Sequence, residues 1–188
     1  MTDVRIPSGI ERIADWAFHG CSGLTSLSIP ENVRSIGALA FSECTGLSTF
    51  TIPENVASIG NAAFRGCASL RNVYAKGDAP EADSTIFLNT GTLTVHYLPG
   101  TEGWQAEFGG RPTVLWLPRV RIEGRGTKPF GFTIDWTSGR VVVIEVSTEL
   151  NSRTWATLQS ITLASDSFEF FDPLSEEFPG RYFRVRIP

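Results

Sequence analysis

Apolar residues recur through the first half of the chain in a pattern that repeats every 23 positions. Columns with this spacing are Ile6, Ile29 and Ile52; Ile13, Ile36 and Ile59; Phe18, Phe41 and Phe64; and Leu24, Leu47 and Leu70. A fixed period of about 20 to 50 residues is typical of repeat proteins, in which each unit buries its apolar side only against copies of itself. The pattern therefore predicts a solenoid.

Each repeat combines strand periodicity with a segment of helical spacing. Around Leu24, Leu27 and Ile29 alternate residues point inward, as in a β-strand, and the following Pro30 ends the strand. Residues 13–18 carry apolar side chains three to five positions apart, which indicates one or two helical turns on the opposite side. The first part of the chain is therefore predicted to be an α/β solenoid of stacked parallel strands and short helical turns.

A fourth repeat is degenerate but remains in register, because Phe87 and Leu93 extend two of the columns. At the same spacing, His96 takes the inward position of a strand, while its neighbours Val95 and Tyr97 point outward. Terminal repeats are commonly atypical, because one of their faces has no neighbouring repeat. We expect residues 75–97 to form the last coil and residues 98–117 to form a cap.

The period is lost after Pro118, and short alternating segments take its place. The segments predicted to be strands are 119–123, 130–136, 141–147, 155–162, 167–171 and 181–187. Turn-forming residues separate them, and strands at this spacing suggest an antiparallel sandwich. We therefore predict two domains, a solenoid at 1–117 and a small all-β sandwich at 118–188.

Two resemblances to known families follow from these motifs. The pattern I-P-x-x-V-x-x-I-G-x-x-A-F-x-x-C-x-x-L, at 29–47 and 52–70, resembles the BspA-type bacterial leucine-rich repeat family, and the similarity covers about residues 4–104. This resemblance implies a bacterial surface or secreted protein that binds other macromolecules. The stretch 145–150, with Trp155 and residues 179–184, resembles a fibronectin type III-like module.

Composition and charge narrow the function classes. The chain is 41% hydrophobic and 19% charged, with a net charge of -4, as expected for a soluble globular protein. It has no run of 18 apolar residues, so we expect no membrane insertion. The start lacks the pattern of a signal peptide, which leaves open a cytosolic protein or one whose leader is missing. Neither half carries excess basic residues, so we expect no nucleic-acid partner.

The residues that could carry chemistry are few. Cys21, Cys44 and Cys67 occur once per repeat, whereas a zinc site needs four ligands, usually in close pairs. We interpret them as buried, reduced core thiols. Only two histidines are present, His19 at a position predicted to face solvent and His96 at a predicted inward one. The sequence therefore predicts no catalytic site, no metal site and no cofactor.

Arginines cluster on two strands of the second domain. Arg119 with Arg121, and Arg184 with Arg186, place pairs of guanidinium groups on one strand face. Such pairs suit carboxylate or phosphate recognition, but acidic residues are near enough to neutralise them. The acids expected to do so are Glu123, Glu176 and Glu177. We therefore interpret this surface as a solvated sheet face.

The outward side of the solenoid strands is the candidate binding surface. Its residues are Ser26, Ser28, Thr49, Thr51, Asn72, Tyr74 and Tyr97. A neutral, hydroxyl-rich face with two adjacent tyrosines suits recognition of a protein or a glycan, because the rings supply area and the hydroxyls supply direction. The alternative is that these are ordinary strand residues of a structural spacer that presents a domain outside this chain.

The first repeat offers one further expectation. Arg5 and Ile6 begin almost in the middle of a repeat, so the first coil has an open apolar end. Trp16, in the column of Leu39 and Ala62, is placed to cover part of it. We expect possible self-association through this uncapped repeat.

The localisation expected from the family resemblance is extracellular or at the cell surface.

Overall fold

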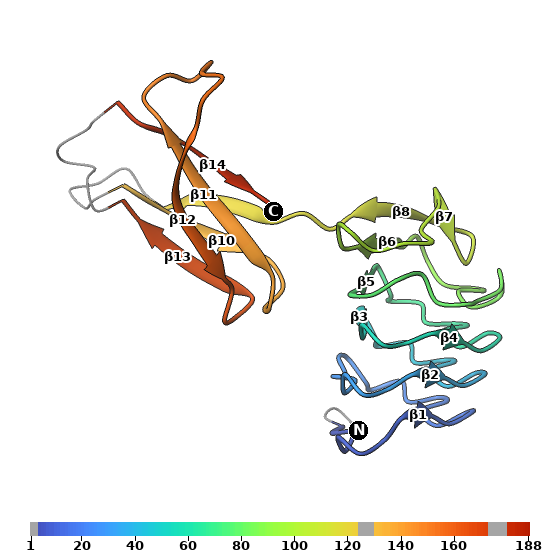
Figure 1. Cartoon of the computed structure of the whole chain (residues 1–188). Helices are drawn as coiled ribbons and strands as arrows, with labels where there is room; N and C mark the ends of the chain where they lie inside the picture. The colour runs from blue at the N-terminus through green and yellow to red at the C-terminus, as the bar shows by residue number, and fades with distance from the viewer. Residues whose placement is uncertain (1–3, 124–129, 173–179) are drawn as a thin grey trace. The chain divides into compact units, whose positions relative to one another are not determined.

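The computed structural model describes residues 4–123, 130–172 and 180–188. The chain divides into two compact units, Met1–Trp116 and Leu117–Pro188. Figure 1 shows stacked coils in the first unit and a group of longer strands in the second.

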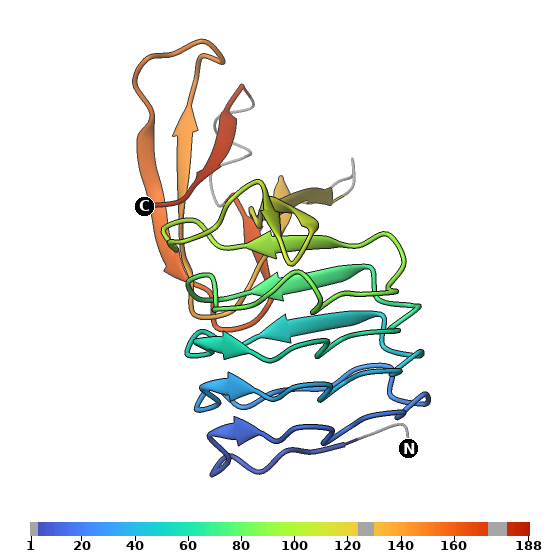
Figure 2. The same ribbon diagram turned by 90° about the vertical axis from the view of Figure 1, so that its right-hand side faces the viewer.

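The first unit is a solenoid whose coils carry short strands on two sides (Figure 2). One sheet is parallel, in the order β1-β2-β4, and consists of β1 (Arg12–Ile13), β2 (Ser35–Ile36) and β4 (Ser58–Ile59). The other has the order β3-β5-β6-β8-β7 and consists of β3 (Thr49–Ile52), β5 (Asn72–Ala75), β6 (Thr94–Tyr97), β8 (Arg111–Leu115) and β7 (Glu107–Phe108). Its strands are parallel except for the β7–β8 pair.

The core of the solenoid consists of the repeated apolar columns, as the 23-residue period predicts. The phenylalanine column forms a continuous stack through the coils. Ring centroids lie 5.2 Å apart for Phe18 and Phe41, 5.3 Å for Phe41 and Phe64, and 5.7 Å for Phe64 and Phe87. Phe41, Phe64 and Phe87 are fully buried, whereas Phe18 in the first coil is only partly buried. Each ring therefore packs mainly against the coils before and after its own.

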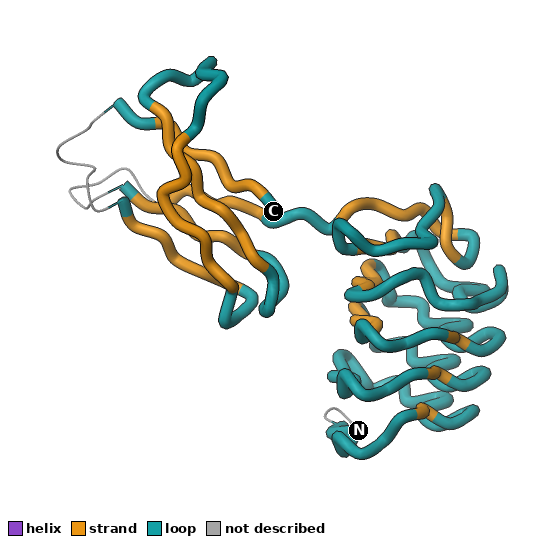
Figure 3. Tube along the Cα trace, viewed as in Figure 1, coloured by secondary structure: helices purple, strands orange, loops and turns teal. Residues whose placement is uncertain are grey.

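The predicted helical turns are wrong: the described residues contain no helix (Figure 3). Backbone N–H groups in these segments donate to carbonyls of the next coil, from Phe18 to Ala40 at 2.7 Å and from Phe41 to Ala63 at 2.8 Å. A helix needs those N–H groups for carbonyls four residues back. Left-handed backbone at Leu39 (φ 56°) and the equivalent Ala62 (φ 55°) also interrupts helical geometry.

The fourth repeat is one residue shorter at its strand than the period predicts. Val73 pairs with Val95, and Tyr74 pairs with His96. Val95 is therefore buried in the core, and His96 points outward, so the predicted orientations of both residues are wrong. The reason is visible in the sequence, because three positions separate Leu70 from Val73 but only two separate Leu93 from Val95. The strand keeps valine, rather than histidine, in the apolar interior.

A hairpin and two aromatic residues cover the last coil. Strands β7 and β8 pair antiparallel through a turn at Gly109 (φ 57°) and Gly110 (φ 71°), two positive φ values that favour glycine. A Cβ atom at Gly109 would lie 2.5 Å from the side chain of Ile86, so the turn also needs glycine to approach the core. Trp104 and Phe108 pack against the buried core residues.

The second unit consists of two antiparallel sheets of three strands each. The first has the order β13-β10-β9, with β9 (Arg119–Glu123), β10 (Gly131–Asp135) and β13 (Ser167–Phe171). The second has the order β12-β11-β14, with β11 (Val141–Ser147), β12 (Ala156–Thr162) and β14 (Tyr182–Arg186). All six predicted strands are present, and their ends differ from the prediction by at most one residue.

The two sheets of the second unit pack face to face through aromatic side chains. The ring of Phe183 in β14 lies 6.0 Å from Phe132 and 5.9 Å from Phe170, both in the opposite sheet, and 5.1 Å from Phe130, which directly precedes β10. Ile134 in β10 and Ile144 in β11 are fully buried. The described part of this unit is therefore an antiparallel sandwich.

The phenylalanine stack leads to a stability prediction. We expect Phe64→Ala to lower the free energy of unfolding by about 3 to 5 kcal/mol, because it removes a fully buried ring and leaves a cavity between two others. Phe18→Ala is the matched control, since its ring is only partly buried, and should cost less. Urea unfolding followed by tryptophan fluorescence measures both. Equal losses in the two variants would contradict a stack whose centre carries more stability than its end.

Candidate functional site

Three aromatic side chains meet on the outward face of the larger solenoid sheet. Tyr74 in β5 and His96 in β6 are direct neighbours in register, and their rings stack with centroids 4.8 Å apart. The ring of Trp116, which follows β8, lies 4.6 Å from Tyr74 at an angle of 47°. Each of the three is half-buried. We call Tyr74, His96 and Trp116 the aromatic patch.

Polar side chains on the neighbouring strands border the aromatic patch. Thr51 in β3 pairs with Tyr74, and Thr49 pairs with Asn72, so these four predicted site residues lie on two adjacent strands. The side-chain oxygen Oδ1 of Asn72 accepts a hydrogen bond from Nε2 of His96 at 2.9 Å, because an amide oxygen can only accept. We call Thr49, Thr51 and Asn72 the polar rim of the patch. The hydrogen bond to Asn72 holds the imidazole of His96 in one orientation.

Three other predicted site residues lie elsewhere. Ser26 and Ser28 line a separate cavity of about 390 Å³, together with Val4, Arg5, Ile6, Leu27 and Pro30. Tyr97 pairs with Ala75, which is buried, rather than continuing the row of Tyr74. Its ring stacks on Trp104 at 5.4 Å and packs against the core. The predicted pair of adjacent outward tyrosines is therefore wrong, and His96 takes the place assigned to Tyr97.

The sequence contained a signal for one of the two missed residues. The shortened spacing between Leu93 and Val95 places His96 outward, and this could have been found by aligning the valines instead of keeping the period. Trp116 lies beyond the repeats and belongs to no column. Its position depends on β8 pairing with β6 and on the hydrogen bond from its backbone N–H to the carbonyl of Tyr97, 2.7 Å long.

The aromatic patch is uncharged near neutral pH. Burial lowers the pKa of His96 below its ordinary value of 6.5, because the surroundings favour the neutral imidazole. With Nε2 donating to Asn72, the neutral ring leaves Nδ1 as an acceptor. The patch can therefore offer ring faces, the hydroxyl of Tyr74 and one nitrogen acceptor, which suits binding by stacking and hydrogen bonds.

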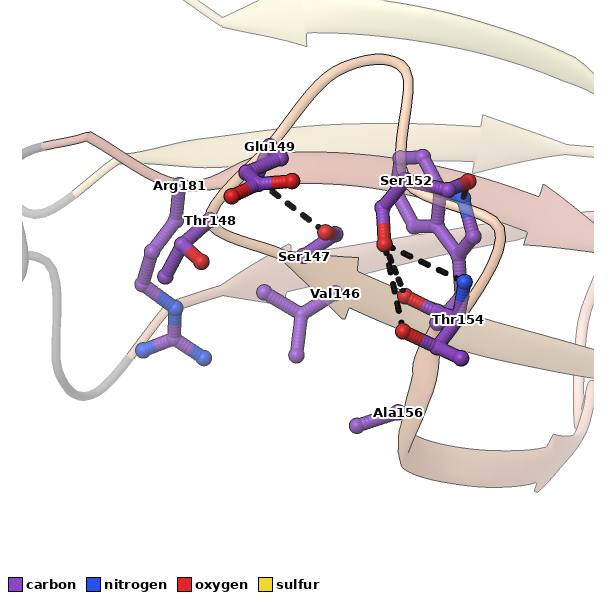
Figure 4. A pocket seen from close by; sticks show the side chains of 9 residues that line it. Val146, Ser147, Thr148, Glu149, Ser152, Thr154, Ala156 and Arg181 are labelled. Carbon is purple, nitrogen blue, oxygen red and sulfur yellow. Dashed lines mark hydrogen bonds between the residues drawn. The ribbon is translucent and has the colours of Figure 1, made fainter.

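A second cavity lies within the sandwich unit (Figure 4). Its volume is about 670 Å³, and its lining residues are Val146, Ser147, Thr148, Glu149, Ser152, Thr154, Trp155, Ala156 and Arg181. Arg181 forms a buried ion pair with Asp172 at 3.1 Å. The indole N–H of Trp155 donates to the carbonyl of Ser152 at 3.1 Å. Arg181 and Trp155 in the lining are thus already engaged within the protein.

The arginine pairs contact acidic residues within the described part of the sandwich unit. Arg184 and Arg186 both contact Glu145, at 2.6 and 3.2 Å, and the hydrogen bond from Arg184 holds the pKa of that carboxyl below its usual range. Arg121 pairs with Asp135. The expected partners Glu176 and Glu177, and the side chain of Glu123, lie outside the described residues.

Comparison with known protein families decides the classification of the chain. Residues 1–103 match the model for the BspA type leucine rich repeat region, which occurs there in six copies. The chain belongs to the BspA-type leucine-rich repeat family. Members of this family are typically bacterial surface or secreted proteins with adhesion and binding roles, and they are generally non-enzymatic. No curated protein and no solved structure matches the chain.

Two further findings concern the surroundings of this BspA-type solenoid. The described residues include no helix long and apolar enough to cross a membrane. Across the same ranges, no group of three or more histidine, cysteine, aspartate or glutamate side chains is arranged to hold a metal ion.

The repeated cysteines of the BspA-type coils form a ladder of hydrogen bonds. The thiol of Cys44 donates to the carbonyl of Phe18, and that of Cys67 donates to the carbonyl of Phe41, each at 3.1 Å. Both side chains are fully buried, and Cys21 is partly exposed. Burial raises the pKa of Cys44 to about 11 and that of Cys67 to about 12. These thiols therefore link adjacent coils and are protonated at neutral pH.

This ladder predicts a graded thiol reactivity. At pH 8 and without denaturant, we expect Ellman's reagent to modify Cys21, while Cys44 and Cys67 react only after unfolding, because the thiolate is the reactive form. Denatured protein should show all three thiols. Rapid reaction of all three in the folded protein would contradict the buried ladder.

The same thiols affect stability at alkaline pH. Since the folded pKa values exceed the ordinary 9.0, the two buried thiols should lose their stabilising contribution as pH rises from 9 toward 11 and 12.

His96 gives a second pH-dependent prediction with the opposite sign. Its folded pKa is lowered, so its contribution to stability is present above the unfolded pKa and is lost as pH falls through the folded pKa. NMR titration of the imidazole, with urea unfolding at several pH values, measures both effects. We expect the His96→Gln variant to show no such loss of folding stability as pH falls. The matched variant at the exposed histidine, His19→Gln, should still show the loss, because its His96 is intact. An imidazole pKa of His96 above 6.5 would contradict the assignment.

Proposed function

We propose that this protein is a non-enzymatic binding or adhesion module of a bacterial surface or secreted protein, which recognises a protein or a glycan through the strand face of its solenoid. The aromatic patch carries the proposal. Tyr74, His96 and Trp116 combine ring faces with hydrogen-bonding groups, and Thr49 and Thr51 add hydroxyls on the adjacent strand. Aromatic side chains of this kind supply much of the binding energy at recognition surfaces.

The chemical character of the aromatic patch suits a ligand whose contacting surface is uncharged. The patch carries no charge when His96 is neutral, and its bordering side chains are threonine and asparagine. Sugar rings and protein loops with exposed backbone present apolar edges next to hydrogen-bonding groups, which match this arrangement. Family membership supports the same proposal, since BspA-type repeats are typical of adhesion and binding proteins.

A structural spacer is the second candidate function. One observation favours it: the patch side chains already contact one another, with Tyr74 stacked on His96, and His96 bonded to Asn72. Mutual contacts of this kind also stabilise a sheet face that binds nothing. In that case the solenoid would present a domain outside this chain, and the patch would contribute to stability alone.

We further propose that the second unit is a fibronectin type III-like module. The described strands support this through their order, since the first, second and fifth strands form one sheet and the third, fourth and sixth form the other. Related immunoglobulin-type sandwiches distribute their strands in a similar way. The division of the chain at Trp116 and Leu117 supports a boundary between the two domains near residue 117.

The binding proposal is tested by separating the two candidate functions. The full chain would be applied to an array of immobilised oligosaccharides and to intact cells, and retained ligands would be titrated against Tyr74→Ala and Trp116→Ala. We expect each variant to weaken binding by about tenfold or more, which corresponds to ~1.4 kcal/mol, because it removes a ring from the contact surface.

Trp16→Ala is the matched control for these variants. Trp16 is 54% exposed and also contacts a histidine, His19, with ring centroids 4.9 Å apart, but it lies in a different column of the solenoid. It should bind as the unmodified protein does. Unchanged binding in Tyr74→Ala and Trp116→Ala, with normal thermal unfolding, would reject the patch as the site and favour the spacer.

A further inference from the structure

The sandwich of the second unit is open along one side. Within the described residues, β14 pairs only with β11, and β9 pairs only with β10, so each is the edge strand of its sheet. Side chains from the two edges line one cavity of about 390 Å³, including Val120 and Ile122 from β9 and Phe183 and Val185 from β14. We call this cavity the β9–β14 groove.

Apolar side chains in the groove point toward the interior but remain exposed. Ile122 pairs with Phe132, and residues directly opposite each other in antiparallel strands lie on the same face of a sheet. Phe132 is 3% exposed, whereas Ile122 is 73% exposed. Val120 shows the same contrast, since it is 44% exposed although its partner Ile134 is fully buried. These side chains belong to the inner layer of the sandwich and lack a covering layer among the described residues.

Edge strand β14 repeats this feature on the other sheet. Val185 pairs with Ile144, which is fully buried, yet Val185 itself is only half-buried. An edge strand also presents backbone N–H and C=O groups along its open side. An extended polypeptide satisfies both requirements at once, because its backbone pairs with the edge while alternate side chains enter the groove. A small apolar molecule would fill the groove but could not pair with the backbone groups of the edge.

The charge on the outer face of β14 indicates which charge a polypeptide bound beside this strand should carry. Arg184 and Arg186 lie on this face and share the single carboxylate of Glu145, which leaves one positive charge in excess. Each guanidinium side chain is 48% exposed, so it can also contact a neighbouring strand. Opposite charges on adjacent strands are favourable, and like charges are unfavourable. Antiparallel pairing of β14 with a second copy of itself would bring arginines together, so a second copy is disfavoured.

We propose that the β9–β14 groove binds an extended segment of another protein, apolar at alternate positions and acidic at the positions between them, which adds a strand to the β12-β11-β14 sheet beside β14. The apolar side chains cover Ile122, Val120 and Val185. The acidic side chains lie on the outer face near Arg184 and Arg186. This site is separate from the aromatic patch of the solenoid.

The probe for this site is a synthetic peptide of about seven residues, the length of a typical strand, in which valine and glutamate alternate. Isothermal titration calorimetry with the full chain measures its affinity. One comparison peptide replaces glutamate with lysine, and another keeps the composition but groups the valines together. We expect the lysine peptide to bind about tenfold more weakly or worse, since it faces like charge. The grouped peptide should not bind, because it cannot place alternate valines in the groove.

Two variants link the peptide to the groove. Ile122→Asp puts a carboxylate among the apolar side chains and should weaken binding of the glutamate peptide by about tenfold or more. Leu150→Asp is the matched control, because Leu150 is 63% exposed and does not line the groove; it should bind the peptide normally. Arg186→Glu should reverse or abolish the preference for glutamate over lysine. Thermal unfolding of each variant checks that the sandwich remains folded.

Several outcomes would overturn the proposal. They are failure of the glutamate peptide to bind the unmodified chain, equal binding of the glutamate and lysine peptides, and full binding by a folded Ile122→Asp variant. Sedimentation that showed the unmodified chain as a dimer, and Ile122→Asp as a monomer, would also overturn it, since a second copy would then occupy the groove.

Discussion

The register between successive coils is the constraint on which the solenoid depends. A coil of 23 residues buries its apolar side only if each column lies directly against the same column of the next coil. The phenylalanine stack, the thiol hydrogen bonds and the backbone bonds from Phe18 to Ala40 and from Phe41 to Ala63 all require this register. Since these interactions run between coils, each coil stabilises its neighbours rather than itself.

This constraint also explains which parts of the solenoid could be predicted from the sequence. The columns and the parallel strands follow from periodicity alone, because the period states which residues stack. The conformation opposite the strands did not follow, since its spacing of three to five residues fits a helix as well as a series of turns. Turns form instead of a helix because the backbone N–H groups of residues such as Phe41 bond to the next coil and do not close a helical turn.

The candidate site shows how one missing residue changes a surface. Keeping the period through the fourth repeat buries His96 and exposes Val95, whereas burial of valine is favoured by the apolar core. The strand shifts by one position, so His96 stacks on Tyr74 and Tyr97 turns toward Trp104. Thr49, Thr51 and Asn72 were predictable because they lie in regular repeats. Trp116 was not, because its place depends on a long-range pairing between β6 and β8.

The two units meet the same requirement, burial of an apolar inner face, in different ways. At the last coil of the solenoid, Trp104 and Phe108 pack over the core beside the β7–β8 hairpin. In the sandwich, alternation located every strand, but no local pattern states which strand edges pair, and the described residues leave Ile122 and Val185 uncovered between β9 and β14. An inner face that is half-covered loses part of its hydrophobic stabilisation, about 25 cal/mol for each Å² still exposed to water. A strand added at that edge would recover this stabilisation while pairing the open backbone of β14, which is why the groove favours an extended polypeptide over any compact ligand.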